Sequence, residues 1–300
     1  MTITSKHNLT KVFALSLGFF LISTVPTFAQ PQLEKTCETR FVRSKCFSNV
    51  TQLIPEIVRA NVVYLGETHD SAQDHENQLK IIQALSGRNR KIALAMEMFQ
   101  RPYQNVINQY LAGKITEAEL VKQTEYNERW GFPWELYAPI MRYAKQNKLP
   151  VLALNTKSEI TRKVSRQGLE SLTAEERKLI PPFSEIRTDN EEYRKLLLAA
   201  FEGHQSAGHG ESNIAERFFL AQVLWDETMA EGVAQFVKAN PGYQVIVLAG
   251  RGHIVFGYGI PSRVERRLGT GKLIQRSVLL SLPEDEDLPK DKKVADFILE

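Results

Sequence analysis

The sequence has few cysteines, little net charge and no long hydrophobic run. Its 300 residues contain two cysteines and carry a formal net charge of +3. A balance this close to neutral excludes the strongly basic surface by which most nucleic-acid-binding proteins hold phosphates, so we expect no nucleic-acid partner. The longest apolar run, residues 12–25, is shorter than the roughly 20 residues that a helix needs to cross a bilayer.

The first 29 residues have the pattern of a secretory signal peptide. Lys6 and Lys11 precede the apolar run, and a segment of small residues ends at Ala29, where we predict the cut. An N-terminal anchor that is not removed is the alternative. No cysteine stands at the cut, so we expect an exported protein, periplasmic or secreted, without a lipid anchor. Removing residues 1–29 takes away two lysines and no acidic residue, which lowers the formal charge from +3 to +1.

The two cysteines, Cys37 and Cys46, lie close together just after the predicted signal peptide. In an exported chain such a pair is expected to form a disulfide, which stabilises by roughly 2–3 kcal/mol in the loop-entropy model. No histidine lies nearby, so a metal site is a poor alternative.

Short apolar runs alternate with helical patterns along the rest of the chain. Runs rich in β-branched residues are typical of buried strands, and helices between them favour parallel pairing. We therefore predict an α/β fold with a mostly parallel sheet. The predicted strands cover residues 61–65, 92–96, 151–154, 244–249, 274–282 and 295–299.

Residues 156–210 differ from the rest because they are charged, favour helices and contain no strand candidate. We predict a core domain made of residues 30–155 and 211–300, with residues 156–210 as a helical insertion or lid. A glycine-rich segment that carries His204 and His209 ends this insertion. Such a segment suits a lid beside a site, and a flexible surface loop is the alternative.

Two of the predicted strands run into the same motif, G-x-x-H. One motif ends in His69 and includes Glu67, and the other ends in His253. A third strand runs into Glu97. Because the carboxyl ends of parallel strands open onto one crevice, we expect these side chains to meet although they are far apart in the chain.

Other polar side chains are candidate neighbours of this crevice. His75 follows His69 by six residues, at the start of the next predicted helix. Asp226 lies among apolar residues of a long helix, where an unpaired polar group costs about 1–3 kcal/mol, so we expect it to orient one of the histidines. Further candidates are Gln222, Asn155 and Tyr258.

Two imidazoles and two carboxylates at one crevice suit three kinds of chemistry. With His69, His253 and Glu97 as ligands, they could hold zinc or another divalent metal that activates water for hydrolysis. Without a metal, His69 could take a proton while Glu67 or Glu97 orients it. As a binding site, a crevice with aromatic neighbours and spare histidines could hold haem, whose iron accepts histidine or tyrosine.

Four motifs stand out when they are taken together: GETH at 66–69, MEMF at 96–99, AQVLWDETMA at 221–230, and GRGH at 250–253 followed by GIPSR at 259–263. As a set they resemble the ChaN family, exported haem-binding proteins linked to iron uptake. That family lies in a wider group that is similar to the Tiki metalloproteases and the erythromycin esterases.

This resemblance implies a three-layer α/β/α sandwich with a helical subdomain. It also implies haem held through a tyrosine between the two subunits of a homodimer, and an outer-membrane uptake receptor as partner. The candidate haem contacts are His75, His204, His209, Tyr258, Tyr126 and Tyr137. In the Tiki relatives, paired G-x-x-H turns and a glutamate bind metal, which maps onto His69, His253 and Glu97. We therefore predict haem binding first, with metal-dependent or acid–base hydrolysis as the alternative.

Overall fold

The computed structural model describes residues 44–88, 91–204, 212–271, 273–281 and 292–300. The chain divides into Met1–Glu34 and Lys35–Glu300, and every feature below belongs to the second unit. The predicted signal peptide, Cys37 and His209 lie outside the described residues. Cys46 is disulfide-bonded. Among the helices that the structure describes, none is long and apolar enough to cross a membrane.

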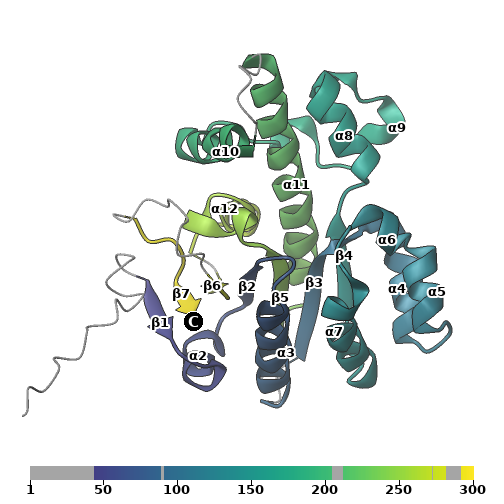
Figure 1. Ribbon diagram of the computed structural model, residues 1–300, viewed down its shortest axis with the longest axis vertical. Coiled ribbons are helices and arrows are strands. Elements are labelled where there is room, and N and C mark those ends of the chain that lie inside the picture. Colours follow the sequence, from purple (N-terminus) through teal and green to yellow (C-terminus); the bar gives the residue numbers. More distant parts are fainter. Residues whose placement is uncertain (1–43, 89–90, 205–211, 272, 282–291) are drawn as a thin grey trace, which may run out of the picture. The chain divides into compact units, whose positions relative to one another are not determined.

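Seven strands form one sheet in which every neighbouring pair is parallel (Figure 1). Their order is β1-β7-β6-β2-β5-β3-β4. This arrangement confirms the predicted α/β fold, and the sheet is wholly rather than mostly parallel. The strands are β1 Lys45–Phe47, β2 Val62–Glu67, β3 Lys91–Gln100, β4 Val151–Asn155, β5 Tyr243–Gly250, β6 Gln275–Leu279 and β7 Phe297–Leu299.

The central strands are apolar without alternation because helices cover both faces of the sheet. Successive residues of β2 point to opposite faces. Val63 and Leu65 belong to one core cluster, whereas Val62 and Tyr64 belong to the other. Every residue of β2 is buried, which makes the end of this strand a rigid base for the residues that follow it.

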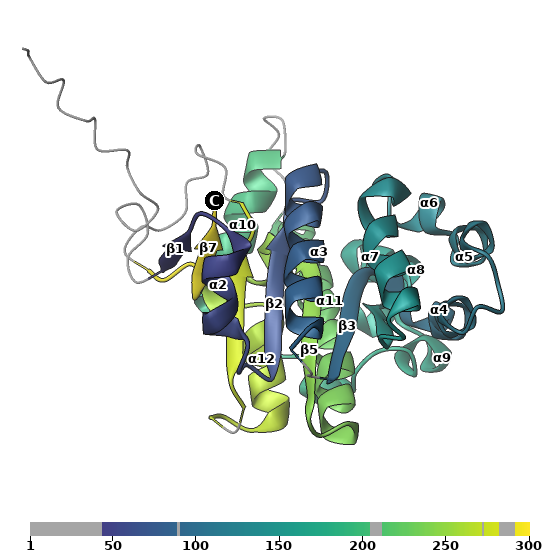
Figure 2. The same cartoon turned by 90° about the horizontal axis from the view of Figure 1, so that it is seen from below.

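Two groups of helices cover the two faces of the sheet. The first core cluster packs the sheet against α2 Val50–Ile57, α3 Ala72–Ser86, α4 Gln104–Leu111 and α7 Trp134–Gln146. Figure 2 shows, from below, α3 between β2 and β3, α7 beside β3, and α2 beside β7. The second cluster packs the opposite face against α11 Ser212–Ala239 and α12 Ile260–Leu268. These layers match the sandwich that the resemblance implied.

Residues 156–204 contain helices and no strand. Ile160 and Val164 of α8 pack against Ala221 and Leu224 of α11, so this part of the chain is anchored on the long helix. Its division from the core as a separate insertion stays a prediction. The helices here are α8 Ser158–Gln167, α9 Ala174–Arg177 and α10 Glu191–His204.

The remaining short helices are α5 Glu117–Gln123 and α6 Tyr126–Arg129, with 3-10 turns at Arg101–Tyr103, Leu169–Ser171, Phe183–Glu185, Arg251–His253 and Val255–Gly257. Thr116 and Glu119 form the capping box that starts α5. Strand β1 was not predicted, β6 and β7 are shorter than predicted, and β3 continues through Glu97 to Gln100. Glu97 therefore lies within the strand and not after its end.

Candidate functional site

The two G-x-x-H turns leave neighbouring strands at the same level of the sheet. β2 and β5 are paired, and Glu67 at the end of β2 is in register with Gly250 at the end of β5. β3, which carries Glu97, lies on the other side of β5. The parallel pairing therefore brings Glu67, Gly250 and Glu97 together at one edge, as the sequence predicted, although Glu97 lies within β3 and not at its end.

Hydrogen bonds to Asp74 fix the first turn. The N–H of Thr68 donates to Asp74 Oδ2 at 2.8 Å, and the N–H of Asp74 donates to the Ser71 hydroxyl that caps α3. These bonds satisfy backbone donors that the start of a helix leaves free. The turn consequently has one conformation, which sets the direction of His69.

Glu67 orients the His69 ring. The Nδ1 atom of His69 lies 2.9 Å from Glu67 Oε1, and the Glu67 side chain is 0% exposed whereas that of His69 is 28% exposed. Tyr137 donates its hydroxyl to Glu67 Oε1, and Gln78 donates its amide to Glu67 Oε2, both at 2.5 Å. The carboxylate is thereby held in place and holds the imidazole through Nδ1, which leaves Nε2 next to Gly250.

His75 supports this arrangement from the buried side. Its Nε2 lies 3.0 Å from the carbonyl oxygen of His69, and its Nδ1 lies 3.1 Å from Gln78 Oε1. The residue is 4% exposed. His75 was a candidate haem contact, but both of its ring nitrogens are engaged inside the protein, and it does not line the cavity beside His69 and His253.

The second histidine lies between two carboxylates. His253 Nδ1 is 2.8 Å from Asp226 Oδ1, and His253 Nε2 is 3.4 Å from Glu97 Oε1. The other oxygen of Glu97 accepts the N–H of Gly250 at 2.8 Å. Asp226 thus occupies the orienting position that its place in the helix suggested.

Glycine is required at two positions of the second turn. A Cβ atom at Gly250 would lie 2.7 Å from His69 Nε2, so the His69 ring rests against this bare backbone. A Cβ atom at Gly259 would lie 2.2 Å from the carbonyl oxygen of His253. Only the absence of a side chain permits both close approaches.

The charges of these groups stabilise one another. Burial lowers the pKa of His253, but Glu97 and Asp226 outweigh it and raise this pKa to about 10. Burial raises the pKa of Glu97, but His253 and His69 lower it to about 2. Burial also lowers the pKa of His69, but the hydrogen bond that His69 donates to Glu67 and the charge of Glu97 raise this pKa above its ordinary value. At neutral pH, His253 and Glu97 therefore form an ion pair.

We expect His253 to make stability depend on pH. Its pKa rises from 6.5 to about 10 on folding, so its contribution is complete below pH 6.5 and is lost as the pH rises through about 10. The wild type should therefore lose a few kcal/mol of its stability advantage over His253→Gln between about pH 6 and pH 10. Urea unfolding measures this difference, and a difference that stays constant over the range would contradict the ion pair.

A cavity of about 490 Å³ opens beside the two histidines. This volume lies within the range of roughly 300–1,000 Å³ that is usual for small-molecule sites. Its apolar walls come from two directions, Phe132 on one side and α10 on the other. The lining residues are Glu67, Thr68, His69, Asp70, Phe132, Leu196, Leu197, Ala200, Gly250, Arg251, Gly252, His253 and Val255.

The donors in this cavity fit haem better than a small metal ion. In the part of the chain that the structure describes, no group of three His, Cys, Asp or Glu side chains is placed to hold a metal ion. The predicted metal set of His69, His253 and Glu97 is therefore not supported, because Glu97 is engaged with His253 and with the Gly250 N–H. Apolar walls with an imidazole at the edge suit a flat macrocycle with a central iron.

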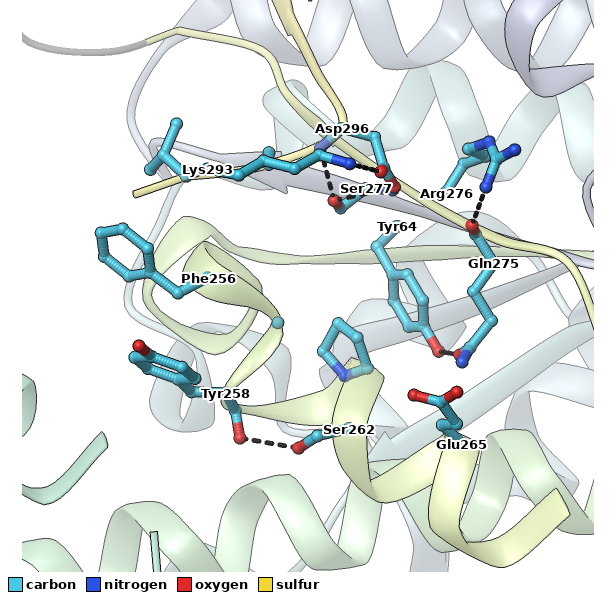
Figure 3. Close-up of a pocket in the computed structure, with 14 residues that line it drawn as sticks. Tyr64, Phe256, Tyr258, Ser262, Glu265, Gln275, Arg276, Ser277, Lys293 and Asp296 are labelled. Atoms are coloured by element: carbon cyan, nitrogen blue, oxygen red, sulfur yellow. Dashed lines mark hydrogen bonds and ion pairs between the residues drawn. The ribbon is translucent and has the colours of Figure 1, made fainter. Parts of the chain in front are cut away.

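The three candidate tyrosines do not line this cavity. Tyr126 and Tyr137 are 1% and 0% exposed, and burial raises the pKa of each well above its ordinary value. Tyr258 lines a second cavity of about 410 Å³ together with Tyr64, Phe256 and Glu265 (Figure 3). The proximity of Tyr258 to His253 in sequence was therefore misleading, since the turn at Phe256 and Gly257, both with positive φ, leads the chain away.

Asn155 and Gln222 are not among the residues that line the cavity. Asn155 Oδ1 is buried without a hydrogen-bond partner among the described residues. His204 is the last residue of α10, and only its backbone is described. The sequence did not indicate the wall made by α10, although Leu196, Leu197 and Ala200 have the spacing of one helix face.

The family model described as haem-binding uptake, Tiki superfamily, ChaN matches residues 53–264. A solved structure of ChaN from Campylobacter jejuni with cofacial haem is 20% identical, covers 82% of this chain and 91% of its own, and has a TM-score of 0.64. An erythromycin esterase mutant, EreC, is 13% identical over 77% of this chain and 72% of its own, with a TM-score of 0.45.

One curated relative is Reticulata-related 5, a chloroplastic protein of Arabidopsis thaliana. It is 29% identical over 261 residues, which are 81% of this chain and 34% of the relative. The chain thus spans about a third of the length of that relative.

Proposed function

Because the chain belongs to the ChaN family of haem-binding uptake proteins in the Tiki superfamily, we propose that it binds haem in the cavity beside His69 and His253. Bound haem would supply a redox-active iron that accepts axial nitrogen or oxygen ligands. The protein's own part is to place an imidazole, exclude water with apolar walls and meet the charges of the ligand.

The observation that carries this proposal is the state of His69. Its Nδ1 is fixed by buried Glu67, while no hydrogen-bond partner faces its Nε2 within the described part of the chain. A histidine that donates one ring nitrogen to a carboxylate and presents the other is the usual form of an imidazole ligand. His253 differs, because both of its nitrogens face carboxylates. In this proposal, His69 Nε2 would be the protein's ligand to the haem iron.

The walls of the cavity suit the rest of a haem molecule. Leu197 and Phe132 offer apolar surface for the faces of the macrocycle. Arg251 lines the same cavity and donates a hydrogen bond to the hydroxyl of Thr68. Its guanidinium charge is complementary to the carboxylates that haem carries at one edge.

A pair of glycine variants tests this placement. Gly250→Ala puts a methyl group 2.7 Å from His69 Nε2, so the ring must move, whereas a Cβ at Gly252 meets nothing within 4 Å. We expect Gly250→Ala to weaken haemin binding by roughly 10–100-fold, as misoriented metal ligands do. Gly252→Ala, in the same turn and also on the cavity wall, is the matched control and should bind like the wild type.

Titration with haemin, followed through the Soret band, measures these affinities. Circular dichroism of both variants establishes that the fold is kept. Equal haemin affinities for the wild type and Gly250→Ala would show that His69 does not contribute to haem binding. The absence of any Soret change with the wild type would end the haem proposal itself.

We also propose that this binding serves haem or iron acquisition outside the cytoplasm. The signal-like pattern of residues 1–29 supports export. Determining the N-terminus of the purified mature protein tests this step, and a chain that begins at Gln30 is the expected result. A mature chain that still begins at Met1 in the cytosolic fraction would contradict export. The homodimer and the outer-membrane receptor stay predictions.

Acid–base hydrolysis is the second candidate, and one observation favours it. Glu97 faces His253, and His253 in turn is held by Asp226, so a charged acid–base pair lies at the cavity edge. Such a pair could move a proton to or from an ester substrate. Assays with p-nitrophenyl esters test this, and Glu97→Gln should abolish the activity. No turnover above buffer across short and long acyl chains would exclude ester hydrolysis.

A further inference from the structure

Helix α10 presents one face to the candidate site. Tyr193, Leu197 and Ala200 lie at positions i, i+4 and i+7, which share one side of a helix. Leu197 and Ala200 line the cavity. Tyr193, one turn before Leu197, is 1% exposed and points into the protein. A single rigid element therefore carries both a part of the cavity wall and a buried hydroxyl.

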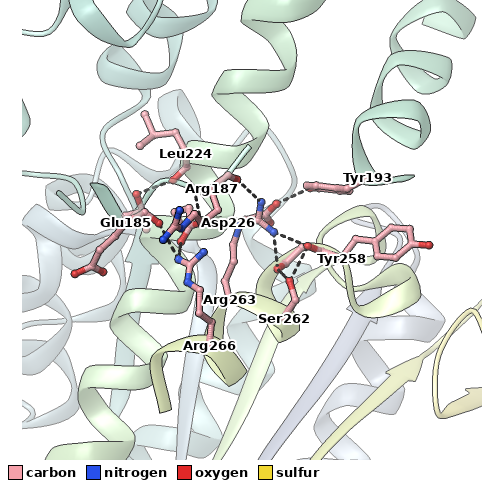
Figure 4. A network of polar contacts seen from close by, with 12 residues as sticks. Glu185, Arg187, Tyr193, Leu224, Asp226, Tyr258, Ser262, Arg263 and Arg266 are labelled. Atoms are coloured by element: carbon pink, nitrogen blue, oxygen red, sulfur yellow. Dashed lines mark hydrogen bonds and ion pairs between the residues drawn. The ribbon is translucent and has the colours of Figure 1, made fainter. Parts of the chain in front are cut away.

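That hydroxyl contacts the carboxylate that orients His253. Tyr193 donates to Asp226 Oδ2 at 2.5 Å, and the other oxygen of Asp226 lies 2.8 Å from His253 Nδ1. Asp226 is 0% exposed. Figure 4 shows the contact between Tyr193 and Asp226 beside the guanidinium of Arg263. Asp226 is thus held from both sides in a chain of three residues.

The position of the Tyr193 ring follows that of α10. The backbone N–H of Tyr193 donates to the Asn190 side chain at 2.9 Å, where the helix starts. The guanidinium of Arg263 lies over the ring at 5.3 Å, and the ring of Phe219 packs edge-on at 6.3 Å. These contacts hold the Tyr193 ring and its backbone in place relative to α10. A shift of α10 therefore moves the Tyr193 hydroxyl away from Asp226.

We propose that Tyr193 is a positioning residue that links the cavity wall on α10 to the orientation of His253 through Asp226. The link rests on the proposed function in one respect, namely that the cavity holds a ligand. A molecule that presses on Leu197 and Ala200 displaces or braces the same helix that supplies the hydroxyl. Because a helix transmits such a displacement over one turn, a ligand that fills the cavity also changes how firmly Tyr193 and Asp226 hold the His253 ring.

Tyr193→Phe tests this link, because it removes the hydroxyl and keeps the ring packing. Tyr64→Phe is the matched control, since Tyr64 is also fully buried and donates its hydroxyl to one side chain, Gln275, on the wall of the second cavity. The readout without ligand is the nuclear magnetic resonance signal of the His253 Nδ1–H proton, assigned with His253→Gln. The readout with ligand is the haemin affinity.

We expect Tyr193→Phe to shift the His253 signal, to speed its exchange with water and to weaken haemin binding roughly tenfold. Tyr64→Phe should change neither. An unchanged His253 signal in Tyr193→Phe would overturn the link, and so would equal changes in both variants. If the signal shifts but the wild type does not bind haemin, the link from α10 to His253 stands and the proposed function fails.

Discussion

Replacing Glu227 by glutamine lowers the free energy of unfolding by about 3–5 kcal/mol, the usual cost of breaking a buried ion pair on one side. Glu227 is 0% exposed on α11. Three arginines of α12 direct their guanidinium groups at its two oxygens: Arg263, Arg266 and Arg267. Removing the carboxylate leaves these charges without their shared partner in a buried place, where an unpaired charge is most costly.

This carboxylate also supports the turn behind His253. Arg263 pairs with Glu227 through Nε and donates through Nη1 to the carbonyl oxygens of Tyr258 and Gly259 (Figure 4). The Gly259 backbone in turn lies against His253. We therefore expect Glu227→Gln to loosen the second G-x-x-H turn in addition to lowering stability.

Glu216→Gln is the matched control for this variant. Glu216 lies on the same helix and pairs with one arginine, Arg194, but its side chain is 44% exposed. Exposed pairs of this kind contribute about 0–1 kcal/mol. Chemical denaturation of both variants measures the contrast. A loss of less than about 1 kcal/mol for Glu227→Gln would show that water reaches the arginines and that the network is not a buried one.

Replacing His69 by alanine weakens haemin binding by more than about 100-fold, because it removes the proposed ligand and not only its support. The fold should remain, since the His69 side chain is partly exposed and Glu67 keeps its bonds to Tyr137 and Gln78. The Soret maximum of any residual complex should move, as the iron loses a nitrogen ligand.

Tyr258→Phe distinguishes iron ligation by His69 from iron ligation by a tyrosine, which the resemblance implies. Tyr258 lies in the second cavity and should leave the haemin affinity unchanged. The reverse pattern, with haemin binding lost in Tyr258→Phe and kept in His69→Ala, would place the haem in the second cavity. It would also identify Tyr258 as the iron ligand.

The sheet and the meeting of the two G-x-x-H turns could be predicted from the sequence. Short β-branched runs such as residues 244–249 have few alternatives to buried parallel strands, and parallel strands bring their carboxyl ends together. Asp226 could also be predicted as a supporting group, because a carboxylate on an apolar helix face needs a partner. These inferences depend on local pattern and on a general rule of topology.

The cavity walls and the role of each tyrosine could not be predicted. No local pattern indicates that α10 faces residues 250–253, since that contact depends on how α10 and α11 pack. Tyr137 was a candidate haem contact, and nothing in the sequence indicated that its hydroxyl would donate to Glu67. Tyr258 was assigned by distance along the chain, which says little after a turn at Phe256 with φ of 56°.

The position of iron in crystals grown with haemin tests the central claim most directly. Anomalous scattering at the iron edge locates the metal without assumptions about the macrocycle. We predict one iron site in the cavity lined by His69, Leu197 and His253, next to His69 Nε2. Iron beside Tyr258 in the second cavity, or on a surface that His69 does not reach, would contradict the claim.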